Sequence, residues 1–130
     1  MPGREEPLAK NLGFRRRLGF ALAGIATVAR LEKSFRTQLC LAAVALAALI
    51  VLRPGAVWTA LVLLSIGLVL ALEAVNAAIE YVADVVHPAY SEGIGRAKDA
   101  AAGAVLLLSL SAAAVGALMA ASTLMERLGS

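Results

Sequence analysis

The sequence predicts an all-α integral membrane protein with three transmembrane helices, preceded by an amphipathic helix at the membrane surface. Hydrophobic residues make up 61% of the 130 residues, against roughly 45–50% in a typical soluble domain. Mean hydropathy is +0.84, and only 16% of the residues are charged. A soluble chain of this length is too small to bury so much apolar surface in one core. We therefore expect the bilayer to solvate much of the chain.

The N-terminal part is the most polar. Residues 1–11 contain two prolines and four charged residues, and we expect them to be disordered. Residues 12–130 are then a single membrane domain. Within it, residues 12–36 carry apolar residues at intervals of three and four, with basic residues at both ends. This pattern predicts a helix that lies in the membrane interface.

Three apolar stretches follow this surface helix. As a helix, the uninterrupted run 39–52 would be about 21 Å long, too short for a hydrocarbon core of about 30 Å, so the first span must recruit preceding residues. Residues 53–55, Arg-Pro-Gly, predict a tight turn, and the proline and glycines of 86–95 predict a second loop. We place the three spans at about 37–52, 56–85 and 96–124.

The basic residues predict the orientation. Of the twelve Lys and Arg residues, all except Arg53 and Arg127 fall on the N-terminal side of the membrane in this topology. The positive-inside rule then places the N-terminus in the cytosol, in a multi-pass protein of a bacterial inner membrane. Because the positive charge flanks the apolar stretches, we expect its partner to be anionic lipid and not nucleic acid.

The end of the second span carries the most informative pattern. Glu73, Asn76, Glu80 and Asp84 are separated by three, four and four residues, so on a helix they share an arc of about 80°. Carboxylates placed so close together repel one another unless a cation lies among them. Glu73 would lie about 26 Å along the helix from its start at residue 56, near the inner edge of the hydrocarbon. Ionisable groups at that depth are typically functional.

The predicted topology brings further charged groups to the same side. Glu32 precedes the first span, and Arg96, Lys98 and Asp99 begin the third. Carboxylates that hold Mg²⁺, beside basic groups that neutralise phosphate oxygens, are what a metal–polyphosphate substrate requires. The sequence has neither a phosphate-binding loop of the G-x-x-x-x-G-K-[ST] type nor a Cys/His set suited to zinc.

Together these motifs resemble the prokaryotic diacylglycerol kinase family. The resemblance rests on the E-x-x-N-x-x-x-E-x-x-x-D pattern, the A-K-D element at 97–99 and the E-x-x-F-R element at 32–36, and it extends over about residues 14–118. It implies a homotrimeric helical bundle, with Mg²⁺ and ATP as cofactor and phosphoryl donor and a membrane lipid alcohol as acceptor.

The resemblance also implies a role for each matching residue. Glu73 would be the catalytic general base on the lipid hydroxyl. Glu32 and Glu80 would hold the metal. The substrate- and nucleotide-binding residues would be Asn76, Asp84, Gly95, Lys98, Asp99 and Arg36.

The sequence leaves the acceptor open between diacylglycerol, which would give phosphatidic acid, and undecaprenol, which would give undecaprenyl phosphate. Thr37 and Gln38 stand where diacylglycerol-phosphorylating members carry a further acid, and no histidine follows Tyr90 as in many relatives. Two alternatives without catalysis are a stripe of ion pairs that packs helices in an oligomer and an oligomeric ion pathway. Residues 56–72 contain no ionisable side chain, so an ion pathway would stop halfway across the membrane.

Overall fold

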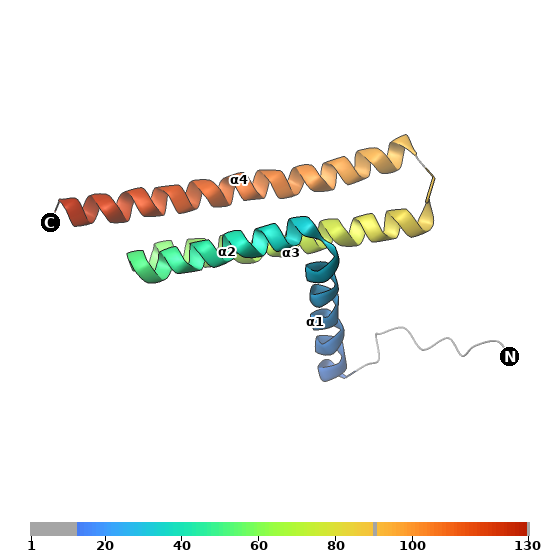
Figure 1. The fold of residues 1–130 in the computed structure, drawn as a ribbon, viewed down its shortest axis with the longest axis horizontal. Helices are drawn as coiled ribbons and strands as arrows, with labels where there is room; N and C mark the ends of the chain where they lie inside the picture. The colour runs from blue at the N-terminus through green and yellow to red at the C-terminus, as the bar shows by residue number, and fades with distance from the viewer. Residues whose placement is uncertain (1–12, 90, 130) are drawn as a thin grey trace.

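The computed structural model describes residues 13–89 and 91–129, which form four helices and no strands. The helices are α1 (Phe14–Leu31), α2 (Lys33–Leu52), α3 (Ala56–Val86) and α4 (Glu92–Leu128). In Figure 1, α2, α3 and α4 run along one another, and α1 projects crosswise from the bundle. The last three helices are each long and apolar enough to cross a membrane. The prediction of an all-α protein with three spans is confirmed, whereas the predicted disorder of residues 1–11 lies outside the described residues.

The boundary between the surface helix and the first span differs from the prediction of one helix over 12–36. The helix ends at Leu31, and Glu32 is extended, with φ −93° and ψ 117°, before α2 begins at Lys33. Arg36 stabilises this break, because its guanidinium donates hydrogen bonds to the carbonyls of Arg30 at 2.7 Å and Ala29 at 3.4 Å. With 20 residues, α2 is about 30 Å long and matches the hydrocarbon thickness.

The predicted turn at 53–55 is present. Arg53 has a left-handed backbone conformation with φ 46°, and its N–H donates to the carbonyl of Leu49 at 2.9 Å, which closes the end of α2. The guanidinium of Arg127, near the end of α4, donates to the carbonyl of Leu52. Arg53 and Arg127 therefore lie at the same end of the bundle, as the topology requires.

The loop between α3 and α4 is shorter than predicted. The helix α4 begins at Glu92 and not near residue 96, so Gly93 and Gly95 belong to its first turns. The carboxylate of Glu92 forms an ion pair with Arg96 one turn later and lies at the positive end of the helix dipole. Both effects favour helix in this segment despite its glycines.

A small apolar cluster forms where α1, α2 and α3 meet. It contains the buried residues Val28, Phe35 and Ala77, with Tyr81 packed against them. Most other large apolar side chains on the helices are exposed on the single chain, where lipid or other subunits would cover them. The cluster fixes the position of the α1–α2 junction on α3, and with it the position of Glu32.

Candidate functional site

The polar stripe predicted from the sequence lies on one unbroken helix. Because α3 extends from Ala56 to Val86, Glu73, Asn76, Glu80 and Asp84 share one face. The structure places this stripe in the half of α3 that approaches the α3–α4 connection (Figure 1). We call this half of the bundle the acidic end.

Glu73 is the most enclosed member of the stripe. Only 3% of its surface is exposed, and it lies on the same buried face of α3 as Val62, Val69 and Ala77. Its carboxyl group has no hydrogen bond or ion pair with another described residue. A buried carboxyl group without a partner inside the protein is energetically unfavourable. Glu73 is therefore available to a bound molecule.

Asn76 lies one turn beyond Glu73 and presents a second available group. Its side-chain nitrogen donates a hydrogen bond to Oε1 of Glu80 at 3.2 Å. Its side-chain oxygen is buried and has no hydrogen-bond donor among the described residues. A buried acceptor without a donor costs about 1–3 kcal/mol. A hydroxyl group of a bound molecule would remove that cost.

Glu32 is held by a residue that sequence reasoning missed. The hydroxyl of Tyr81 donates to Oε1 of Glu32 at 2.7 Å, across 49 residues of chain. Tyr81 belongs to none of the motifs that the sequence analysis singled out. A signal was available: Tyr81 follows Ala77 by four residues on the buried face, and a tyrosine packed there needs a partner for its hydroxyl.

Lys98 joins the acidic end from α4. Its ammonium group donates to Oδ1 of Asp84 at 2.8 Å, and the side chains of Lys98 and Asp84 are 34% and 68% exposed. The Glu80 carboxylate lies within electrostatic range of both the Lys98 ammonium and the Tyr81 hydroxyl. The structure thus gathers four predicted residues at the acidic end of the bundle: Glu32, Glu80, Asp84 and Lys98.

Three other predicted site residues, Arg36, Gly95 and Asp99, have different surroundings from those of the stripe. Arg36 covers the last carbonyls of α1. Gly95 already uses its backbone N–H in a hydrogen bond to the Ser91 carbonyl at 2.9 Å. Asp99 is exposed and has no side-chain partner within residues 13–89 and 91–129. Among the described residues, none of these three forms a side-chain hydrogen bond or ion pair with the stripe.

The carboxylates named as metal ligands fit a magnesium ion that shares its coordination with a substrate. In the described part of the chain, no group of three or more Asp, Glu, His or Cys side chains could hold a metal alone. Protein sites for Mg²⁺ commonly supply one or two carboxylates, and substrate phosphates and water supply the rest. Glu32 and Glu80 each accept one hydrogen bond from a neutral donor, so their negative charge is not neutralised. Asp84, in contrast, is paired with a cation.

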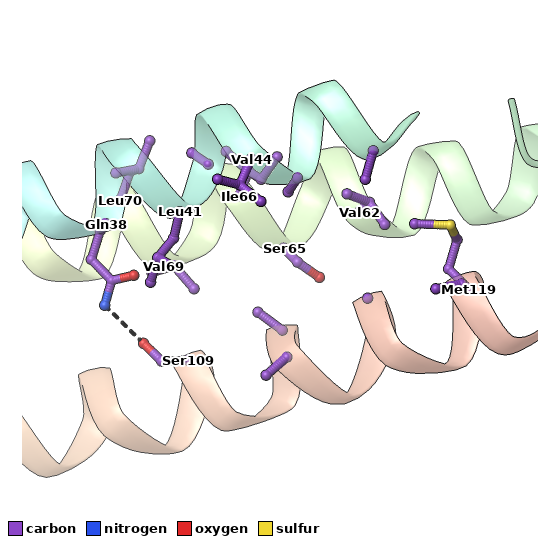
Figure 2. A pocket seen from close by; sticks show the side chains of 17 residues that line it. Gln38, Leu41, Val44, Val62, Ser65, Ile66, Val69, Leu70, Ser109 and Met119 are labelled. Carbon is purple, nitrogen blue, oxygen red and sulfur yellow. Dashed lines mark hydrogen bonds between the residues drawn. The ribbon is translucent and has the colours of Figure 1, made fainter. Parts of the chain in front are cut away.

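An apolar groove leads toward this site. A cavity of about 350 Å³ lies between α2, α3 and α4, and its lining is almost entirely apolar. Figure 2 shows one end of it, where the amide nitrogen of Gln38 donates to the hydroxyl of Ser109 at 3.2 Å and so connects α2 with α4. Val69 lines the groove beside this hydrogen bond, and Glu73 follows Val69 by one turn on the same face. The groove therefore extends along α3 to about one turn before Glu73, which is not itself a lining residue.

Comparisons with known proteins identify what the chain is similar to. The family model of prokaryotic diacylglycerol kinase matches residues 19–120, a range that includes every candidate residue named above. A protein named diacylglycerol kinase from Synechocystis sp. is 34% identical over 125 residues, which cover 88% of this chain and 69% of the relative.

Proposed function

The chain belongs to the prokaryotic diacylglycerol kinase family, and from this we propose that it transfers the γ-phosphoryl group of ATP to the hydroxyl of a membrane lipid alcohol. Diacylglycerol is the leading acceptor, with phosphatidic acid as product, and undecaprenol is the alternative. The observation that carries the proposal is that buried Glu73, whose carboxyl group has no partner among the described residues, lies about one turn beyond the end of an apolar groove on the same helix.

In this proposal the groove holds hydrocarbon of the acceptor. Its lining is apolar, and its volume of about 350 Å³ lies within the range of about 300–1,000 Å³ typical of ligand sites. A chain in the groove would run along α3 through Val69 toward Glu73. The lipid hydroxyl would then reach the carboxyl group while its hydrocarbon stays at membrane depth.

The proposed reaction uses two residues of the stripe on the acceptor. The lipid hydroxyl donates its single hydrogen to the Asn76 oxygen, which has no donor among the described residues, as it binds, and then turns that hydrogen to the Glu73 carboxylate before reaction. When its oxygen attacks the γ-phosphorus of ATP, the bond from phosphorus to the β–γ bridging oxygen breaks. The hydroxyl proton passes to Glu73, and ADP leaves. Positioning of the hydroxyl and removal of its proton are the contributions expected from these residues.

The remaining residues of the acidic end act on ATP. Glu32 and Glu80 would hold Mg²⁺, which when bound neutralises charge on the polyphosphate. Lys98 would neutralise phosphate oxygens as the charge shifts toward the leaving group. Asp84, which accepts a hydrogen bond from Lys98, would hold its ammonium group at the site. Asp99, Gly95 and Arg36 complete the proposed nucleotide-binding set.

We also propose that the chain works as a homotrimer in a bacterial inner membrane, with its N-terminus in the cytosol. The distribution of Lys and Arg supports this orientation. Extensive exposed apolar surface on the helices leaves area for contacts between subunits. Within the described part of one chain the metal-binding set is incomplete, so a neighbouring subunit could supply further groups.

The direct test uses purified protein in mixed micelles with γ-labelled ATP and equal amounts of diacylglycerol and undecaprenol. We expect label to enter one of the two lipids in a reaction that depends on Mg²⁺, and the labelled lipid identifies the acceptor. Absence of label from both lipids, with or without ATP hydrolysis, would contradict the proposed function.

A further inference from the structure

Tyr81 links α3 to the junction between α1 and α2 through a side-chain hydrogen bond. Within residues 13–89 and 91–129, its bond to Glu32 is the only side-chain hydrogen bond between α3 and the α1–α2 junction. Its 2.7 Å length is typical of a strong hydrogen bond from a hydroxyl to a carboxylate. The bond therefore determines where one oxygen of Glu32 lies relative to α3.

Both Tyr81 and Glu32 are placed so that their hydrogen bond can orient the Glu32 carboxylate. The ring of Tyr81 packs against the cluster of Val28, Phe35 and Ala77, so its hydroxyl projects from a fixed base. Glu32 is the single extended residue between two helices. Its backbone is held by hydrogen bonds with Val28 and Arg36, but its side chain has no partner other than Tyr81 in the described part of the chain. Without the hydroxyl, the Glu32 carboxylate would be free to rotate.

The chemistry of the donor is also significant. A phenol hydroxyl is neutral, so it orients the carboxylate without cancelling its charge. One oxygen is occupied and the other remains available to a cation. The neutral amide of Asn76 holds one oxygen of Glu80 in the same way, whereas the exposed Asp84 is paired with Lys98. At the acidic end, the two carboxylates proposed to hold Mg²⁺ are the two with neutral donors among the described residues; Glu126, near the C-terminal end of α4, accepts from the neutral Ser122 hydroxyl.

From these observations we infer that Tyr81 is a positioning residue that orients the Glu32 carboxylate to bind a divalent cation. The inference depends on the proposed function for the role of Glu32. Residues that hydrogen-bond to metal ligands typically change metal affinity by about 10–100-fold when they are removed. We therefore expect the hydroxyl of Tyr81 to act on metal affinity more than on the maximum rate.

The test is the substitution Tyr81→Phe, which removes the hydroxyl and keeps the ring in the apolar cluster. Mn²⁺ binding to the full-length protein is measured in the presence of a non-hydrolysable ATP analogue. Bound Mn²⁺ is quantified from the decrease in the electron paramagnetic resonance signal of the free ion. The expected result is at least about a tenfold weaker Mn²⁺ affinity, with an unfolding temperature close to that of the wild type. In the kinase assay, the Mg²⁺ concentration for half-maximal rate should rise by a similar factor, while the rate at saturating Mg²⁺ changes little.

The control is Thr59→Val, which removes a hydroxyl near the start of α3 that bonds to the Gly55 carbonyl of the preceding turn. This variant should bind Mn²⁺ as the wild type does. Wild-type Mn²⁺ affinity in Tyr81→Phe, or no Mn²⁺ binding by the wild-type protein, would overturn the inference. If Mn²⁺ binding weakens as expected but neither lipid is phosphorylated by the wild type, the inference stands and the proposed function fails.

Discussion

The ammonium nitrogen of Lys98 lies 2.8 Å from a carboxylate oxygen of Asp84, and this pair marks the register of α4 against α3. The two helices are antiparallel neighbours (Figure 1). Glu73 lies eleven residues before Asp84, and Ser109 lies eleven residues after Lys98. Both are thus about 16 Å from the pair along their helices, at the same depth. The hydrogen bond between Gln38 and Ser109 therefore lies level with Glu73.

Substitution of Lys98 by methionine should lower turnover by about 100-fold, because a cation that stabilises transferring phosphate would be lost. Asp84 is exposed, so the unfolding temperature should change little. The measurement is the steady-state rate at saturating lipid and ATP. Arg96→Met is the matched control, since the ion pair that Arg96 forms in the described part of the chain is with Glu92 on the same helix. Equal activity in the two variants would show that Lys98 is a surface residue.

Substitution of Asn76 by alanine should raise the KM for the lipid about tenfold, because the acceptor hydroxyl loses one hydrogen bond. The Mg²⁺ requirement should rise as well, since Glu80 loses its only hydrogen-bond donor in the described part of the chain. Kinetics are measured with lipid and Mg²⁺ varied separately. An unchanged KM for lipid in Asn76→Ala would remove Asn76 from the acceptor site.

The hydrogen bond between Gln38 and Ser109 should contribute modestly to stability. Such bonds within membranes contribute about 0.6 kcal/mol on average. Gln38→Leu and Ser109→Ala should each destabilise the protein, and the double variant should lose less than the sum, because no polar group is then left unpaired. Unfolding in mixed micelles gives the three values. Ser111→Ala, which removes a bond within α4, is the control, and strict additivity would argue against the pairing.

Arg36 offers a choice between two roles. The structure predicts that Arg36→Met frays the last turn of α1, because the carbonyls of Ala29 and Arg30 lose their donor. Hydrogen exchange near residue 31 should accelerate, while the KM for ATP stays close to that of the wild type. A large rise in that KM with unchanged exchange would favour the nucleotide-binding role implied by the resemblance.

Much of this arrangement follows from local pattern. The apolar lengths predict the three spans, and the spacing of Glu73, Asn76, Glu80 and Asp84 predicts their shared face, because both depend only on helix geometry. The break at Glu32 was not predictable in this way. No proline or glycine marks it, and the helix stops there because Arg36 closes it from the following helix.

Features that depend on contacts between distant residues were also missed. Tyr81 finds Glu32 only because the cluster around Phe35 brings α1, α2 and α3 together. The groove requires three packed helices, and its closing pair, Gln38 and Ser109, is separated by 71 residues. For Gly93 and Gly95, glycine suggested a loop, but the Glu92–Arg96 pair favours helix there.

The turnover of Glu73→Gln tests the central claim most directly. Glutamine keeps the size of the buried side chain but is unable to accept the hydroxyl proton. The account predicts a rate at saturating lipid, ATP and Mg²⁺ at least about 100-fold below that of the wild type, with the unfolding temperature and the Mn²⁺ affinity unchanged. Wild-type turnover by folded Glu73→Gln would show that Glu73 is not the base.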